Sequence, residues 1–339
     1  MAYAYIPVTV TNSESTATPT DFQQLVTVDL SYYSAFLNQD LSNTFFSSDT
    51  AGSTVVTSWL ESGNTYPFNS VNFWLYLPDG IGASSSITVY LQVDLSGANH
   101  FNDTTTGVAP QLSSTYAEYD DGANIFNYYQ RWGGLSALPA NWSSVLDTVI
   151  TFNSDYTEIA SAPTTSGWYG IYLNPIPSSL SSTTTIWEFY GNNYDGVNAG
   201  QYIGTASGSP DNNSGYLFSE GDTTTNLIYL ANDGVQFYTS TGYNDTNVNK
   251  IYGMVMESST SLMMTINYNS IFTTSAISES PTYFDIAASN SSGTEPSTGI
   301  YVYWLRTRTY PPNGVMPSAS TGTPSGFPYY NTTSYDELL

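Results

Sequence analysis

Apolar and polar residues alternate one by one along several segments of this chain, and this pattern constrains its fold more than any other feature. The clearest segment is SSITVYLQVDL at 85–95, where every second residue from Ile87 to Leu95 is apolar. YIPVTVT at 5–11 and QQLVTVDL at 23–30 repeat the pattern. Successive side chains of a β-strand point to opposite faces of a sheet, so a period of two predicts half-buried strands.

The order of the segments predicts an all-β chain with two antiparallel β-sandwich domains in tandem. Only SYYSAFLNQDL at 31–41 is typical of a short helix. The predicted parts are an N-terminal β-sandwich at 1–95, a linker at 96–123, a second β domain at 124–316 and an irregular tail, rich in Pro, Ser, Thr and Gly, at 317–339.

Two features mark the second domain. KIYGMVM and SLMMTINYN predict a hairpin with its turn around 257–260, where polar residues suit a tight connection. IYVYWLRTRTYPPNGVMPS at 300–318 predicts a final strand that ends at Pro311 and Pro312, because proline cannot continue a ladder.

The charge balance excludes two classes of partner. The chain has four Lys and Arg against 28 Asp and Glu, a formal net charge of −24. Four basic residues cannot build a patch that follows nucleic-acid phosphates, and anionic membranes repel an acidic surface. No apolar run reaches the ~18 residues of a membrane span. We therefore expect no nucleic-acid partner and no membrane insertion.

The same composition favours an acid-stable extracellular protein. Near pH 2–3 most carboxyl groups are protonated, which leaves about +5 from the four Lys and Arg and the one His. A chain with few ion pairs loses little stability as its carboxylates titrate. Cysteine is absent, which excludes disulfides, thiolate metal sites and cysteine nucleophiles.

Two of the four basic residues, Arg306 and Arg308, lie on the predicted final strand. Strand alternation predicts two faces, one with Val302, Trp304, Arg306 and Arg308 and the other with Tyr303, Leu305 and Thr307. The favoured interpretation is structural: Trp304 packs, and the arginines pair with carboxylates on neighbouring strands. The alternative is a ligand-facing ladder in which an arginine meets an acidic group or a sugar.

The sequence offers little support for catalysis. Glycoside hydrolysis needs two carboxyl groups about 5–10 Å apart in one cleft. No predicted strand carries a paired E-x-D or E-x-E, and Asp195, the partner nearest to Glu188, falls in a predicted turn. A Ser–His–Asp triad requires His100, the only histidine, which has no nucleophile-elbow sequence nearby. We predict no enzyme activity and no catalytic residues.

Calcium is the most plausible metal, because a hard cation binds clustered carboxylate and amide oxygens on loops. Clustered oxygen donors occur in predicted loops, above all at Asp120, Asp121 and Asp195. None of these loops has EF-hand spacing, and Asp, Asn and Gly clusters more often make turns. We therefore predict no metal and no cofactor, with calcium as the open alternative.

Carbohydrate binding by aromatic stacking is the best positive hypothesis. Apolar sugar faces pack on aromatic rings while amides bond the sugar hydroxyls. The nominated residues lie in GWYGIYLN and IWEFYGNNYD and are Trp168, Trp187, Tyr190 and Asn193, with Tyr169 and Tyr194 beside them. The competing interpretation places Trp168 and Trp187 in the core, where tryptophans of strands are more often found.

Several of these segments resemble a known kind of surface protein. IPVTVTNSESTATPTDFQQLVTVD, with VVTSWLESGN, FWLYLP and SSITVYLQV after it, resembles a β-sandwich domain of unassigned function in surface proteins of archaea. GVAPQLSSTYAEYDDGANIFNYY resembles the segment that follows that domain. KIYGMVMESSTSLMMTINYNS and YVYWLRTRTYPPNGVMPS resemble the concanavalin A-like, laminin G-like jelly roll of those proteins. The resemblance covers the chain to about residue 318, and its closing stretch is the most distinctive. It implies a jelly-roll-like sandwich whose last strand pairs near the sheet centre, and it implies no particular activity.

The chain departs from those surface proteins at its start, because MAYAYIPVTVTNSES has neither the basic nor the apolar region of a signal peptide. We interpret it as a non-enzymatic structural and recognition protein on the surface of an archaeal virion, in a spike, turret or fibre that contacts the host. Its expected partners are other virion or surface proteins, further copies of itself and a host-surface glycan. The alternatives are a secreted or cell-surface archaeal adhesin or filament subunit with a carbohydrate-binding jelly roll and, less favoured, a polysaccharide-active enzyme.

Overall fold

The computed structural model confirms an all-β fold. It describes residues 3–145, 147–161, 167–173, 185–193, 201–206, 215–220, 226–232, 235–240, 248–256, 261–275, 283–290 and 299–328, and for some of these, Trp168 and Asn193 among them, the backbone alone. The chain clusters into two compact units, Met1–Ile125 with Pro311–Leu339, and Phe126–Tyr310. Strand pairing is antiparallel throughout the described residues except between β5 and β8.

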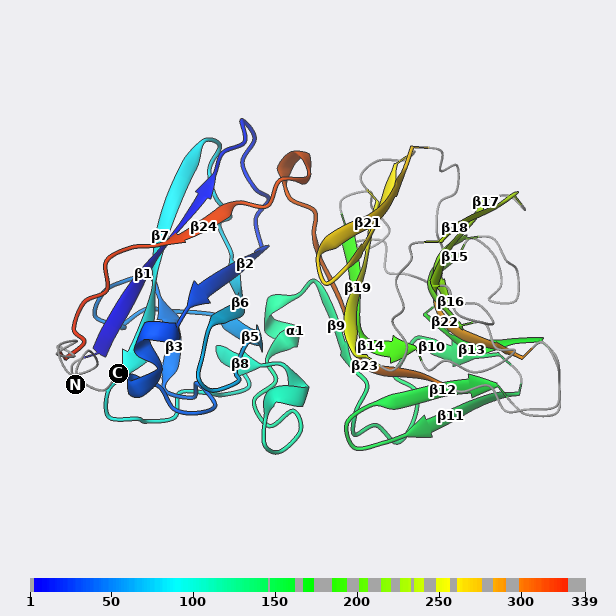
Figure 1. Cartoon of the computed structure of the whole chain (residues 1–339), viewed down its shortest axis with the longest axis horizontal. Helices are drawn as coiled ribbons and strands as arrows, with labels where there is room; N and C mark the ends of the chain where they lie inside the picture. Colours follow the sequence, from blue (N-terminus) through cyan, green and yellow to red (C-terminus); the bar gives the residue numbers. More distant parts are fainter. Residues whose placement is uncertain are drawn as a thin grey trace, which may run out of the picture. The chain divides into compact units, whose positions relative to one another are not determined.

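The first unit is a sandwich of two sheets (Figure 1). One sheet has the order β24 (Ser318–Thr321), β1 (Tyr3–Asn12), β7 (Ser85–Asp94), β3 (Thr44–Ser47), β4 (Val55–Val56). The other has the order β2 (Phe22–Asp29), β6 (Ser70–Leu77), β5 (Ser58–Ser62), β8 (Thr106–Val108). The apolar positions of the alternating segments, such as Val8 on β1 and Val28 on β2, fill one core between the sheets.

Three segments of the first unit differ from the sequence expectation. The tail predicted to be irregular from 317 contains β24, which pairs with β1 so that Thr11 lies opposite Ser318 (Figure 1). The predicted linker at 96–123 contains β8, which pairs in parallel with β5. The predicted helix at 31–41 is a single 3-10 segment, η1 (Ser31–Phe36). Backbone hydrogen bonds between strands do not require alternating apolar side chains, so polar segments can pair with the edge strand of a sheet.

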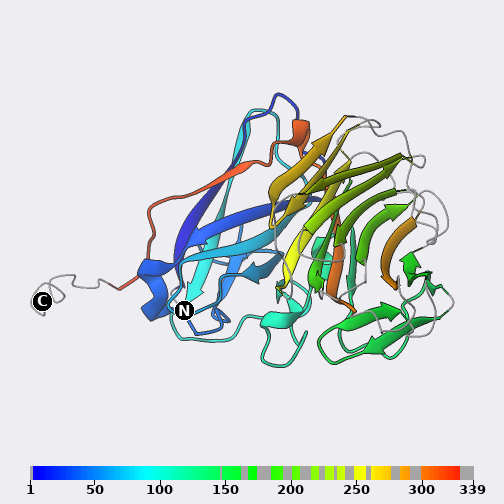
Figure 2. The ribbon, with the colours of Figure 1, turned by 45° about the vertical axis from the view of Figure 1, so that its right-hand side comes forward.

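The second unit also has two sheets around one core, and Figure 2 shows their strands running side by side. The seven-stranded sheet has the order β10 (Trp142–Ser144), β13 (Gly167–Leu173), β22 (Tyr283–Asn290), β15 (Gln201–Ala206), β16 (Gly215–Glu220), β17 (Asn226–Asn232), β18 (Val235–Ser240). The eight-stranded sheet has the order β11 (Thr148–Phe152), β12 (Thr157–Ser161), β23 (Ile300–Thr309), β14 (Thr185–Asn193), β19 (Lys250–Met256), β20 (Leu262–Ile266), β21 (Asn269–Thr274), and β9 (Tyr128–Arg131) pairs with β23. The predicted hairpin is confirmed as β19 and β20, while its turn at 257–260 lies outside the described residues.

Strand β23 is the predicted final strand of this domain. It lies inside its sheet between β12 and β14, and Pro311 follows its end. The resemblance implied a central position for this strand, and the sheet order agrees.

One prediction about β23 was wrong. Its ladder with β14 shifts register at Tyr190 and Gly191, whose partners are Trp304 and Val302, and Tyr303 is left as an extra residue. Such a bulge reverses the alternation of the strand. Val302 therefore belongs to the hydrophobic core, whereas Trp304 lies on the opposite face together with the two arginines.

Short helical segments complete the described structure: η2 (Pro110–Leu112), α1 (Gly122–Ile125) and η3 (Pro312–Gly314). None of the helices in the described part of the chain is long and apolar enough to cross a membrane.

Candidate functional site

Glu188, Arg306 and Arg308 form a charge cluster on the face of the eight-stranded sheet that points away from the core. The Arg306 Nε donates to Glu188 Oε2 over 2.8 Å, and the Arg308 Nε donates to Glu188 Oε1 over 2.9 Å. The Arg308 Nη2 also lies 2.8 Å from Oε1. Glu188 stands directly opposite Arg306 in the ladder of β14 and β23. The favoured interpretation of the two arginines is therefore confirmed: they pair with a carboxylate on a neighbouring strand.

The charge cluster is enclosed by protein. The side chains of Glu188 and Arg306 are 1% and 0% exposed. Burial disfavours the ionised carboxyl, but Arg308 and Arg306 outweigh this effect and lower the pKa of Glu188 below its usual value. Glu188 is therefore ionised, and removal of its charge would leave two guanidinium groups buried together.

Arg306 is also held by aromatic side chains. Its guanidinium carbon lies 4.5 Å from the ring centre of Phe126 and 4.6 Å from that of Trp304. Its Nη2 donates to the Tyr268 hydroxyl over 2.6 Å. A planar guanidinium can stack and donate in several directions at once, which an ammonium group cannot do.

Beside the charge cluster, the same face of the sheet carries four half-buried tyrosines, which we call the tyrosine row: Tyr156, Tyr301, Tyr303 and Tyr190. The ring of Tyr156 lies 4.7 Å from Tyr301 and 5.6 Å from Tyr303, measured between centroids. Tyr303 lies 5.4 Å from Tyr190, which stacks on Trp304 at the same distance. The row thus extends from the start of β12 across β23 to β14 as a continuous aromatic surface.

Polar groups flank the tyrosine row. Tyr301 stands directly between Glu158 on β12 and Asn192 on β14. The Asn192 Nδ2 donates to Asn249 Oδ1 over 2.9 Å, while the buried Asn192 Oδ1 has no hydrogen-bond partner in the described part of the chain. Burial, assisted by the charge of Glu158, raises the pKa of Tyr156, so its hydroxyl remains a donor at neutral pH. Aromatic rings beside a half-buried carboxylate suit a ligand with one apolar face and many hydroxyls.

Two of the nominated carbohydrate-binding residues have described side chains. Trp187 is 5% exposed and stacks on Phe284 at 4.8 Å in the core, so it presents no face to a sugar, and the core interpretation holds for it. Tyr190 belongs to the tyrosine row.

The other nominated positions are described less fully. Only the backbone is described for Trp168, opposite Ser289 in β13 and β22, and for Asn193, opposite Ile300 in β14 and β23. Tyr194 and Asp195 lie outside the described residues.

The calcium candidates of the first unit occupy a different kind of environment. The Trp59 Nε1 donates to Asp120 Oδ1 over 3.1 Å. Burial, with the charge of Asp120 as a second cause, raises the pKa of Asp121 to about 8. In the described residues no group of three or more His, Cys, Asp or Glu side chains is arranged to hold a metal ion. A neutral, enclosed carboxyl is a poor ligand for Ca²⁺, which prefers carboxylate oxygens.

The residues considered for catalysis have structural contacts. Glu188 bonds both arginines, and a carboxylate with a lowered pKa is unsuited to general-acid work. The His100 Nε2 lies 3.0 Å from Asp94 Oδ2 in the first unit.

Apart from Tyr190, the tyrosine row was missed at the sequence level, although a signal existed. Tyr301 and Tyr303 interrupt an otherwise buried strand, and Tyr156 precedes β12. Their neighbourhood depends on the pairing of β12, β23 and β14, which are far apart in the sequence.

Comparison with known proteins adds one relative. No family model matches the chain. The chain is similar to a viral protein. "Uncharacterized protein 562" of Sulfolobus islandicus rod-shaped virus 1 is 30% identical over an alignment of 351 positions, which covers 92% of this chain. The chain spans 58% of the length of that relative.

Among solved structures, similarity extends over about half of the chain. The carbohydrate recognition domain of Emp46p in its metal-free form matches with a TM-score of 0.42 and 13% identity, over 56% of this chain and 99% of that domain. The Bacillus licheniformis beta-glucanase matches with a TM-score of 0.41 and 12% identity, over 53% of this chain and 97% of the enzyme. At these values the matches do not indicate what this chain binds or whether it is an enzyme.

Proposed function

We propose that this chain is a non-enzymatic structural and recognition protein of an archaeal virion, exposed on the particle as part of a spike, turret or fibre. The observation that supports the viral assignment is the similarity, over 92% of the chain, to a protein of an archaeal rod-shaped virus. A surface of neutral polar groups with few ion pairs suits an acidic extracellular medium. Its proposed partners are other virion proteins, further copies of the chain and a glycan of the host surface.

The tyrosine row supports the glycan part of the proposal. Neighbouring tyrosine rings from the start of β12 across β23 to β14 provide an extended surface for sugar rings, and Glu158, opposite Tyr301, provides an acceptor carboxylate. The negative charges of Glu158 and Asp155, which both act on Tyr156, favour a neutral polysaccharide over an anionic one, which they would repel.

The charge cluster supports a non-enzymatic role. Glu188 is a glutamate on an interior strand, and its carboxylate is bonded by Arg306 and Arg308. A glycosidase needs one carboxyl group with a raised pKa beside a second carboxylate, and Glu188 has the opposite shift.

Glycan binding can be tested with host-envelope polysaccharides immobilised on a sensor surface. We expect Tyr301→Ala to weaken binding about tenfold, because it removes the central ring of the row, which corresponds to about 1.4 kcal/mol. Tyr90→Ala is the matched control, since Tyr90 is also half-buried and contacts another tyrosine, Tyr5, in the first unit. Equal binding by both variants and the parent chain would refute the tyrosine row as the glycan site.

The location in the virion can be tested separately by mass spectrometry of purified particles and of washed host envelope. Peptides of this chain should follow the particles, and antibody labelling of intact particles should place it on their surface. Recovery from the envelope alone would instead favour the adhesin or filament-subunit alternative.

A further inference from the structure

Strand β7 leaves one backbone edge open over its first half. β1 pairs with β7 along its whole length, whereas β3, on the other side, pairs only with Tyr90–Val93. In the part of the chain that the structure describes, no strand lies against residues 85–89 on the β3 side. The reason is that β3 ends at Ser47, where the chain turns toward β4. Such an edge presents backbone N–H and C=O groups to an incoming strand.

This edge lacks the features that usually protect an open strand. Natural sheets block exposed edges with lysine, proline, inward-pointing charges or a covering segment. The open part of β7 reads Ser-Ser-Ile-Thr-Val at 85–89, with no charge and no proline. Its isoleucine, threonine and valine are residue types that favour pairing in a strand.

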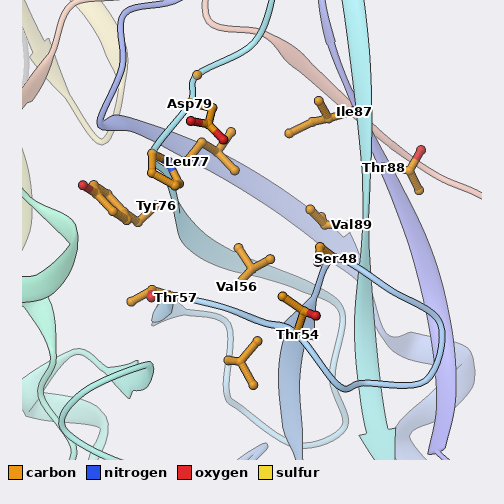
Figure 3. Close-up of a pocket in the computed structure, with 13 residues that line it drawn as sticks. Ser48, Thr54, Val56, Thr57, Tyr76, Leu77, Asp79, Ile87, Thr88 and Val89 are labelled. Atoms are coloured by element: carbon orange, nitrogen blue, oxygen red, sulfur yellow. The ribbon is translucent and has the colours of Figure 1, made fainter.

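A hollow of about 550 Å³ lies beside the open edge (Figure 3). The main apolar groups that line it are Val56 of β4, Leu77 of β6, and Ile87 and Val89 of β7. In Figure 3, Ile87 and Val89 point toward Leu77 and Val56, whereas Thr88 points to the other side of the strand. The hollow is large enough for two or three apolar side chains and lies where an added strand would place them.

We propose that the open edge of β7 and this hollow form an acceptor site for an extended strand of another protein. The incoming strand continues the line of β3, pairs in antiparallel orientation with residues 85–89, and places alternate apolar side chains between Ile87, Val89, Leu77 and Val56. In this mode of recognition backbone bonds give affinity, and pockets for alternate side chains give specificity. The proposal is independent of the glycan contact, since the site lies wholly in the first unit.

Charge indicates what kind of strand fits. Asp79 is exposed at the rim of the hollow, on a chain with a formal net charge of −24. A second copy would bring the same negative charge, and two of its four basic residues, Arg306 and Arg308, are held in the charge cluster. A strand from a different protein, with lysine or arginine beside its apolar residues, is therefore the complementary partner.

The probe for this site is a phage-displayed library of random linear decapeptides, panned at pH 6–7 against the full chain. We expect enrichment of peptides in which apolar residues alternate with polar ones and a Lys or Arg is present. Ile87→Lys places a charge in the hollow and should weaken the selected peptides at least tenfold. Thr9→Lys, on the neighbouring strand β1 and away from the open edge of β7, is the matched control and should change their affinity less than twofold.

Two further readouts locate the site and test the charge argument. A selected peptide should slow amide hydrogen exchange at residues 85–89, and Asp79→Asn should remove the preference for Lys and Arg in a repeated selection. Circular dichroism should show that each variant melts within a few degrees of the parent chain. The proposal is wrong if no alternating peptide is enriched, if Ile87→Lys and Thr9→Lys act alike, or if exchange slows elsewhere instead.

Discussion

Glu188 in the second unit and Asp121 in the first are carboxylic acids buried to the same extent, since each is 1% exposed. Their ionisation differs in direction. Burial and the charge of Asp120 raise the pKa of Asp121 to about 8, whereas two arginines overcome burial and lower the pKa of Glu188. Burial alone therefore does not decide whether an acid in this protein is charged: a fixed cation within hydrogen-bonding distance does.

The two environments have different structural causes. Glu188 lies opposite Arg306 in a regular antiparallel ladder, which sets the distance between the two side chains. Asp121 precedes α1 and packs against Gly107 of β8, where a Cβ atom would collide with its carboxyl group. Asp120 and Asp103 are the charged groups that act on it, and both are negative. A neutral Asp121 fits this site and an ionised one does not.

The largest expected effect is on the pH dependence of stability. The folded Asp121 keeps its proton to about pH 8, whereas an unfolded one loses it near 3.8. The contribution of Asp121 to stability should thus be full below pH 3.8 and fall by about 1.4 kcal/mol per pH unit as pH rises toward 8, about 6 kcal/mol in total.

Urea unfolding at several pH values, followed by tryptophan fluorescence, measures this slope. Asp121→Asn should abolish it, because the amide carries no proton to lose, and Asp79→Asn, at an exposed position, should leave it unchanged. If the stability of the parent chain does not change between pH 4 and pH 8, the pKa of Asp121 is not raised, and the contrast with Glu188 is wrong.

The second effect is the loss of the anionic partner in the charge cluster. Glu188→Gln leaves Arg306 and Arg308 buried without a counter-charge and should cost about 3–5 kcal/mol at pH 7. Because the folded pKa of Glu188 is lowered, its contribution is present above 4.5, the value of a free glutamic acid, and disappears as pH falls through the folded pKa. The parent chain and the variant should therefore converge in strong acid.

Denaturant unfolding at pH 7 and in acid checks both statements. Glu158→Gln is the matched control on β12, since Glu158 is only half-buried, and it should cost less than about 1 kcal/mol. Equal losses in the two variants would show that the charge cluster does not stabilise the second unit.

The smallest effect separates the charge of Arg306 from its shape. Arg306→Lys keeps the positive charge but loses the bond to Tyr268 and the stacking on Phe126, so we expect a loss of about 1–2 kcal/mol. Arg308→Lys should cost less, because two nitrogens of Arg308 meet the same Glu188 oxygen, which one ammonium can still contact.

Thermal unfolding of both lysine variants beside the parent chain measures the difference. If Arg308→Lys lowers stability more than Arg306→Lys does, the stacking and the Tyr268 bond of the Arg306 guanidinium contribute little to stability.

Several parts of this structure could be predicted from the sequence because they depend on local patterns. Alternation at 85–95 identified β7, and the two prolines at 311 and 312 identified the end of β23. The scarcity of basic residues indicated that Arg306 and Arg308 have carboxylate partners. The acidic partner itself, Glu188, lies 118 residues before Arg306, and no local pattern links the two.

Other parts were misjudged because non-local pairing overrides local pattern. The bulge at Tyr303 places Val302 in the core, away from Trp304, and β1 recruits β24 from a tail of Ser, Thr and Pro. Trp187 could be assigned to the core or to a ligand surface from sequence, and only its stacking on Phe284 decided between them.

The sequence by itself determined that this chain folds into antiparallel sheets and carries few charged residues, nearly all of them acidic, because alternation and composition can be read without knowing which segments meet. The tertiary structure alone decided which acid is charged, which tyrosines form a row and which half of β7 is left open. These depend on which segments become neighbours in the fold. For Glu188 and the tyrosine row, the pairing joins residues more than 100 positions apart through backbone hydrogen bonds, which any residue except proline can form.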